Sequence, residues 1–233
     1  MMTAQKTASP KAPIILGLEA SGEHASAAMV QDGRLLAETR MDQRHGHASY
    51  FVTLAHEAVQ KAGLRFADIT HVAAGIGPGS FTGLRVCLSA AKGFVLAGGL
   101  VGVGVNGLRA RAFAAQQAGV CLPVISCADT RRGVYFYQSY DEALIAQDAI
   151  AEASLDEVAS LASDRSVALP PLADDQQAGF ANMMVTKMSA RHIALLANQD
   201  IAHQEIAKGD APLLPLDALY VAAPKLGPAK KAR

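Results

Sequence analysis

The chain has 233 residues, 51% of them hydrophobic, and its 21 basic residues balance its 21 acidic residues. This length and composition suffice for one large domain or two small ones with a buried core. A protein that binds nucleic acid unaided usually carries a basic excess, so a net charge of zero argues against independent binding of tRNA or DNA. The three cysteines form no CxxC pair, which disfavours a disulfide framework or a zinc site and favours the cytoplasm.

The amino-terminal part of the chain predicts three strands before any helix. Residues 1–13 lack the apolar core of a signal peptide and are predicted to be a flexible tail. The apolar run 14–20 predicts a buried strand, and Asp32-Gly33 between two extended runs is typical of a hairpin turn. No apolar run of about eighteen residues is free of charges and glycines, so we expect no membrane span.

Strands and helices then alternate. Apolar residues recur at helical spacing in residues 47–63, where Gly63 closes the helix, and a strand at 69–77 leads into a glycine-rich loop. A second helix is predicted over residues 82–97, followed by a strand. Three meandering strands followed by this alternation predict a compact ribonuclease H-like α/β subdomain over residues 14–105.

Residues 106–223 predict a smaller second subdomain. It begins with an alanine-rich helix and continues with two strands around a turn at 131–133. Ser154 and Glu157 form a capping box, which predicts the start of a short helix. Residues 224–233 are polar and are predicted to be a second flexible tail.

The segment 75–83 contains four glycines and a proline, and two interpretations of it remain open. It is not a P-loop, because Leu84 and Arg85 follow the last glycine where lysine and a hydroxyl residue are required. It is not a GxSxG nucleophile elbow either, because Thr82 stands in place of the second glycine. The segment is therefore a tight turn capped by Ser80 or Thr82, which spacing alone favours, or an anion site made by bunched backbone N–H groups. The candidate anion contacts are Gly77, Gly79, Ser80 and Thr82.

Three weaker signals lie elsewhere. Residues 102–107 match GxGxxG, but the glycines fall inside a predicted strand and not in the turn after one, so we do not expect a dinucleotide site. Glu19 ends the first strand, where a carboxylate either holds metal-bound water or bonds the neighbouring backbone. His45 and His47 lack a third ligand nearby, and no metal site is predicted.

Residues 75–93, GIGPGSFTGLRVCLSAAKG, resemble the signature of the TsaB (YeaZ) family. Members of this family are the bacterial subunit needed for threonylcarbamoyladenosine modification beside the tRNA anticodon. The opening strand and hairpin, the first helix, the strand pair at 124–141 and the segment 215–227 resemble the family as well. The resemblance implies an α/β fold of the actin-like ATPase (ribonuclease H-like, ASKHA) class, with two subdomains of mixed sheets flanked by helices, related to the catalytic subunit TsaD.

The resemblance also implies a non-catalytic subunit that binds and supports TsaD, together with the ATPase TsaE. TsaD holds its metal with an HxxxH pair, and no two histidines of this chain are spaced in that way. No intrinsic cofactor is expected; ATP or ADP would bind only in the complex, tRNA would be reached only through the complex, and a homodimer is compatible with the family. The alternative is an enzyme of the same fold, a small-molecule kinase or a glycoprotease-like hydrolase, that uses Glu19 and the glycine loop. Glu19-Ala20 replace the family's usual Asp-Thr, and Cys87 replaces a common glycine.

The partner interface is expected on the two helices 47–63 and 82–97, because the family uses this surface and small residues on the second helix allow close approach. The alternative is that the apolar stripe of each helix packs only on its own sheet, which we favour for Leu84, Leu88 and Val95. The candidate interface residues are Tyr50, Phe51, Leu54, Gly83, Arg85, Cys87, Ala91 and Lys92.

Overall fold

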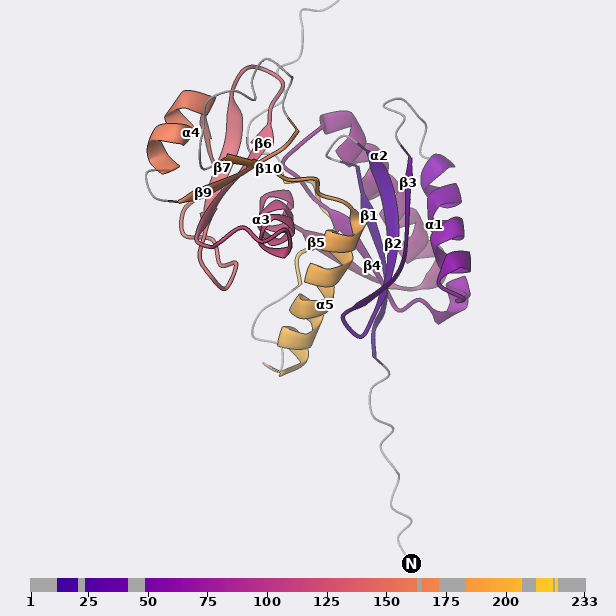
Figure 1. Cartoon of the computed structure of the whole chain (residues 1–233). Coiled ribbons are helices and arrows are strands. Elements are labelled where there is room, and N and C mark those ends of the chain that lie inside the picture. Colours follow the sequence, from indigo (N-terminus) through magenta and orange to yellow (C-terminus); the bar gives the residue numbers. More distant parts are fainter. Residues whose placement is uncertain are drawn as a thin grey trace, which may run out of the picture.

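The chain forms two five-stranded mixed sheets flanked by helices (Figure 1). The structure, a computed structural model, describes residues 12–20, 24–41, 49–162, 165–171, 183–206, 213–219 and 221. The tail predicted at 224–233 and nearly all of the tail predicted at 1–13 lie outside these residues, as do His45 and His47.

The first sheet has the order β3-β2-β1-β4-β5. Its antiparallel meander comprises β1 (Ile14–Glu19), β2 (Ala25–Gln31) and β3 (Arg34–Met41), and β4 (His71–Gly75) and β5 (Val101–Val105) extend it in parallel with β1. This arrangement confirms the predicted three-strand meander followed by alternation of strands and helices.

The hairpin between β2 and β3 turns where the sequence predicts. Asp32 has φ 51° and Gly33 has φ 69°, so both occupy the left-handed region that a two-residue hairpin turn requires. The turn thereby sets the register in which Gln31 faces Arg34.

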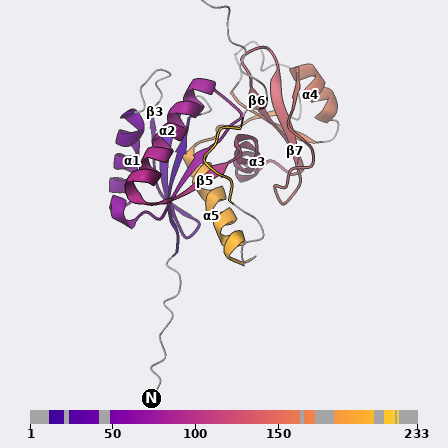
Figure 2. The same ribbon diagram turned by 180° about the vertical axis from the view of Figure 1, so that it is seen from behind.

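Helices cover both faces of the first sheet, which explains why β1 is a continuous apolar run. On one face lie α1 (Ser49–Lys61) and α2 (Phe81–Gly98), and on the other lies α5 (Ala190–Ile206) (Figures 1 and 2). Gly17 allows the close approach of α5, since a Cβ at this position would lie 2.6 Å from the carbonyl oxygen of Ala190.

The second sheet has the order β10-β9-β6-β7-β8. The predicted strand pair forms β6 (Val124–Asp129) and β7 (Tyr135–Tyr140), while β8 (Ala151–Ala153), β9 (Ser166–Leu169) and β10 (Met183–Val185) are short strands that the sequence analysis did not predict. They are too short to show a hydrophobic alternation.

Two helices pack on the second sheet. The predicted capping box is present at the start of α4 (Leu155–Ala162), where Ser154 donates its backbone N–H to Glu157 and Glu157 donates its own to the Ser154 hydroxyl. Helix α4 lies on one face of the second sheet, and the other face of this sheet packs on α3 (Gly107–Gln117), which also contacts α5.

The two subdomains are joined by α3 and by the returning carboxyl-terminal part of the chain. The Arg109 guanidinium on α3 binds both carboxylate oxygens of Asp200 on α5 at 2.8 Å. Residues 213–219 cross back to β5, where a Cβ on Gly104 would overlap the carbonyl oxygen of Pro215. The GxGxxG match thus contributes to close backbone packing. Part of the predicted second subdomain, α5, lies on the first sheet.

Candidate functional site

The glycine loop connects β4 to α2 and is anchored on both sides. Ser80 is the N-cap of α2, and its Oγ accepts the Gly83 backbone N–H at 3.3 Å. The Gly77 carbonyl accepts the N–H of Gly107 at 2.7 Å, which ties the loop to the start of α3. The predicted capped turn into a helix is therefore present, with Ser80 and not Thr82 as the cap.

Gly83 allows this turn to lie against the end of β1. A Cβ on Gly83 would overlap the carbonyl oxygen of Ala20, so this position has no room for a side chain. Its role is to permit close packing inside the subdomain, and it is only partly exposed.

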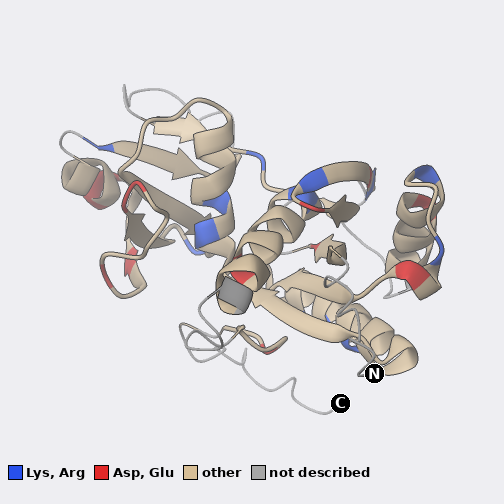
Figure 3. Cartoon of the chain, turned by 90° about the horizontal axis from the view of Figure 1, so that it is seen from below, with Lys and Arg blue, Asp and Glu red and all other residues tan. Residues whose placement is uncertain are grey.

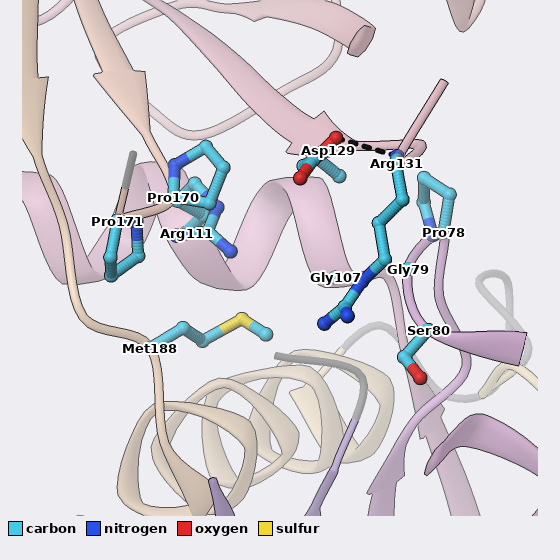
Figure 4. A pocket seen from close by; sticks show the side chains of 11 residues that line it. Pro78, Gly79, Ser80, Gly107, Arg111, Asp129, Arg131, Pro170, Pro171 and Met188 are labelled. Carbon is cyan, nitrogen blue, oxygen red and sulfur yellow. Dashed lines mark hydrogen bonds between the residues drawn. The ribbon is translucent and has the colours of Figure 1, made fainter. Parts of the chain in front are cut away.

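A cavity of about 60 Å³ lies at the junction of the two subdomains, beside the glycine loop (Figure 4). Of the candidate anion contacts, Gly79 and Ser80 line it, whereas Gly77 and Thr82 do not. The remaining walls come from α3, from the turn after β6, from the prolines after β9 and from Met188. The cavity thus combines segments that are far apart in the sequence.

Two arginines line this cavity. Arg111 on α3 is 5% exposed and donates through Nη1 to the Thr186 carbonyl at 2.6 Å. The Arg131 side chain extends from the turn after β6 toward Ser80, and its backbone N–H donates to the Asp129 carboxylate at 2.6 Å (Figure 4). Sequence analysis missed both arginines as site residues.

Glu19 does not line the cavity. It is 1% exposed at the end of β1, and its carboxylate lies against Gly75. Burial, followed by the negative charge of Glu19, raises the pKa of the Cys87 thiol well above its usual value. The alternative enzyme, which would use Glu19 together with the glycine loop, gains no support from this geometry.

Half of the predicted partner interface is buried in the core. Phe51, Leu54, Cys87 and Ala91 are between 0% and 2% exposed and pack between their helices and the first sheet. The prediction that these four side chains face a partner is wrong. The small residues of α2 allow this helix to lie close to its own sheet. Leu84 and Leu88 also pack on that sheet, in agreement with the alternative favoured for them.

The outer sides of α1 and α2 carry exposed apolar residues that sequence analysis did not select. Leu96 is 87% exposed, Val52 is 56% exposed and Phe81 is 42% exposed. Arg85 is exposed and lies over the Phe81 ring at 4.2 Å, and Lys92 pairs with Asp217 at 3.0 Å. We call the exposed sides of α1 and α2, which carry Val52, Phe81, Arg85, Lys92 and Leu96, the α1–α2 face; Tyr50 on α1 is partly exposed.

Helix α2 resembles a membrane-spanning helix in its composition, but it packs on the first sheet. Among the described residues, α2 is the one helix that is both long enough and apolar enough to cross a membrane, judged by length and composition alone, with a mean hydropathy of 1.2. Its Leu84, Cys87, Leu88 and Ala91 are buried against the sheet. This packing is that of a helix covering a sheet.

Comparison with known proteins identifies the family. The profile of the family described as TsaD, tRNA N6-adenosine threonylcarbamoyltransferase, matches residues 34–208, which is most of the chain. The chain belongs to the TsaD family.

Within the TsaD family, the chain is similar to TsaB (YeaZ) proteins, as the sequence resemblance predicted. It is 29% identical over 126 residues to the tRNA threonylcarbamoyladenosine biosynthesis protein TsaB of Escherichia coli K12, covering 54% of each chain. It is 35% identical over 117 residues to the tRNA N6-adenosine threonylcarbamoyltransferase of Granulibacter bethesdensis, covering 43% of this chain and 32% of that enzyme. The matches thus span about half the length of the TsaB relative and about a third of the transferase.

Solved structures confirm the actin-like fold class. YeaZ from Pseudomonas aeruginosa superposes with a TM-score of 0.69 at 20% identity, covering 90% of this chain and 100% of that chain. The activator of the 2-hydroxyisocaproyl-CoA dehydratase from Clostridium difficile, with bound ADPNP, superposes with a TM-score of 0.52 at 10% identity, covering 85% and 99%.

The described residues do not fit the metal site that the sequence resemblance attributes to TsaD. Among the residues that the structure describes, no group of three His, Cys, Asp or Glu side chains is placed to hold a metal ion. The cavity between the subdomains carries Arg111 and Arg131, whose positive charges oppose a cation.

Proposed function

We propose that this protein is a non-catalytic subunit that binds TsaD and supports its formation of N6-threonylcarbamoyladenosine beside the anticodon of tRNAs. The similarity to TsaB proteins carries the proposal, together with a YeaZ-like fold over nearly the whole chain. The absence of any HxxxH histidine spacing from the sequence further supports a non-catalytic role.

The proposed partners follow from the same similarity. TsaD is the direct partner and TsaE the further component, in the cytoplasm, and ATP or ADP binds only in the complex. The protein reaches tRNA only through the complex, since its net charge is zero and positive and negative residues are scattered over both subdomains (Figure 3).

The α1–α2 face is our proposed docking surface for TsaD. It combines exposed apolar side chains with an arginine stacked on an aromatic ring, and aromatic residues and arginine are enriched at protein interfaces. Figure 2 shows α1 and α2 side by side on the outer side of the first sheet, where another chain can approach both. A homodimer would use the same face, so the two associations should compete.

Leu96→Lys tests this surface. Because Leu96 is 87% exposed, the substitution removes apolar contact area without disturbing the core, and lysine is favourable near a helix carboxyl terminus. We expect association with TsaD to weaken about tenfold or more, as at an interface hot spot. The measurement is sedimentation of the variant mixed with TsaD, alongside its melting curve.

Leu161→Lys is the matched control. Leu161 lies on α4 of the second subdomain and is 43% exposed. We expect this variant to bind TsaD as the wild type does. Wild-type affinity of a folded Leu96→Lys variant would place the docking surface elsewhere, whereas failure of the wild-type chain itself to bind TsaD would refute the proposed function.

A further inference from the structure

A pocket of about 380 Å³ lies at the carboxyl-terminal end of α2, apart from the cavity between the subdomains. Leu16 of β1, which is 0% exposed, lies at its base. One wall comes from the short 3-10 helix η1 (Phe66–Asp68), and the other comes from Phe94 on α2 and from Leu100. Ligand pockets in proteins have volumes of about 300–1,000 Å³, so this space is large enough to receive a side chain or a small molecule.

The lining of this pocket is entirely apolar. Among the described residues, no charged or hydrogen-bonding side chain lines it, whereas pockets for metabolites carry a few polar groups that orient the ligand. Helix α2 ends at Gly98 in the wall, and the negative end of the helix dipole disfavours phosphates and carboxylates. Arg65 and Asp68, which flank the wall residues Phe66 and Ala67, form an ion pair of 2.8 Å with each other. The pocket therefore fits a neutral, apolar group and not a nucleotide.

Aromatic rings connect this pocket to both helices of the α1–α2 face. The Phe66 ring stacks on the Phe94 ring of α2 at 6.0 Å between centroids, and the His56 ring of α1 stacks on Phe66 at 6.3 Å. Phe66 is 39% exposed, so this wall of the pocket reaches solvent. Leu96, which is 87% exposed on the α1–α2 face, lies on α2 between Phe94 and Ala97, and both of these residues line the pocket. The pocket is thus continuous with the α1–α2 face.

We propose that this pocket receives an apolar side chain of TsaD, which anchors TsaD on the α1–α2 face. The inference rests on the proposed docking of TsaD and adds the position of its anchor. Binding energy at protein interfaces is concentrated where a side chain fills a well-packed, desolvated pocket. A leucine or phenylalanine side chain needs no polar partner, so a wholly apolar lining suits it, and the exposed Leu96 beside the pocket helps to exclude water.

Ala67→Phe tests the anchor by filling the pocket from its own wall. Ala67 is exposed on η1 and lines the pocket, so the added ring occupies the space without entering the core. We expect TsaD to bind this variant about tenfold or more weakly, while the melting temperature is not lowered. Ala143→Phe is the matched control, because Ala143 is exposed in the second subdomain, and this variant should bind TsaD as the wild type does. Sedimentation with TsaD and a melting curve are recorded for all three chains.

Indole, a neutral apolar probe, reports on the pocket without TsaD. In ligand-observed NMR we expect indole to bind the wild type and Ala143→Phe but not Ala67→Phe, and to be displaced by TsaD. Indole that stays bound in the TsaD complex assigns the pocket to a small molecule and overturns the anchor, as does wild-type TsaD affinity of a folded Ala67→Phe variant. A wild-type chain that fails to bind TsaD refutes the proposed function itself, which distinguishes that failure from a misplaced anchor.

Discussion

Ala91→Glu is expected to lower the free energy of unfolding by about 3–5 kcal/mol, the range found when a charge is left unpaired in a protein interior. Ala91 is 0% exposed and lies between α2 and the first sheet, in the core that includes Leu88 and Leu84. A carboxylate there must either remain unpaired in an apolar environment or take up a proton, and the longer side chain also displaces its neighbours. Urea denaturation followed by circular dichroism gives the change in free energy.

Ser89→Glu is the control for this prediction, because Ser89 is exposed on the same helix two residues away. We expect its stability to stay within about 0.5 kcal/mol of the wild type, as for most surface substitutions. If Ala91→Glu unfolded at the same urea concentration as Ser89→Glu, Ala91 would face solvent or a partner, and the inward orientation of α2 would be wrong.

The second large effect is a loss of stability in mild acid that depends on His192. Its imidazole is 7% exposed, and Nδ1 accepts the Ser189 backbone N–H at 3.1 Å at the start of α5. Burial, with the nearby Arg191 charge, lowers the pKa of His192 from 6.5 to about 4. The folded protein therefore keeps this side chain neutral at pH values where the unfolded chain binds a proton.

The direction of the pH effect on stability follows from this difference in pKa between the folded and the unfolded state. The unfolded state binds more protons between pH 6.5 and pH 4, so the contribution of His192 is fully present above pH 6.5 and is lost as the pH falls toward 4. We expect the loss to be on the order of 2–3 kcal/mol. It is measured by urea denaturation at a series of pH values.

His192→Gln should remove this part of the pH dependence, because its amide oxygen can still accept the Ser189 N–H but takes up no proton. His203→Gln, a substitution at an exposed position of the same helix, should keep the pH dependence of the wild type. Identical pH profiles for the wild type and His192→Gln would contradict a neutral buried imidazole.

Much of the first subdomain could be predicted from local sequence patterns. The turn Asp32-Gly33, the glycine after α1 at Gly63 and the helical spacing in α1 and α2 each depend on residues close together in the chain. The three short strands of the second sheet could not be predicted in this way. Strand β9 is defined mainly by its parallel pairing with β6, which lies about forty residues earlier in the chain.

The orientation of α2 could not be read from its sequence, because apolar residues occur on both sides of this helix. Leu84 faces the sheet, but Leu96 faces outward on the same side as the exposed Arg85, Ser89 and Lys92, so the exposed side is not purely polar. The small residues of α2 predict space for a partner helix, whereas in the structure Ala91 and Cys87 allow α2 to approach the protein's own sheet.

Only part of the lining of the cavity between the subdomains could be predicted from the sequence. Gly79 and Ser80 belong to a visible glycine motif, but Arg111 and Arg131 are twenty residues apart, on a helix and in a turn. Their convergence depends on how the two sheets are joined, and no local motif encodes it.

Formation of threonylcarbamoyladenosine on unmodified tRNA, followed by mass spectrometry, tests the central claim most directly. The reaction contains the carbamoylated threonine precursor that TsaD uses, with TsaD and TsaE, and is run with and without this chain. The proposed function predicts that adding the chain raises product formation well above that of TsaD with TsaE, and that the chain alone forms none. Product from the chain alone, or an unchanged yield when it is added to TsaD and TsaE, would contradict a supporting, non-catalytic role.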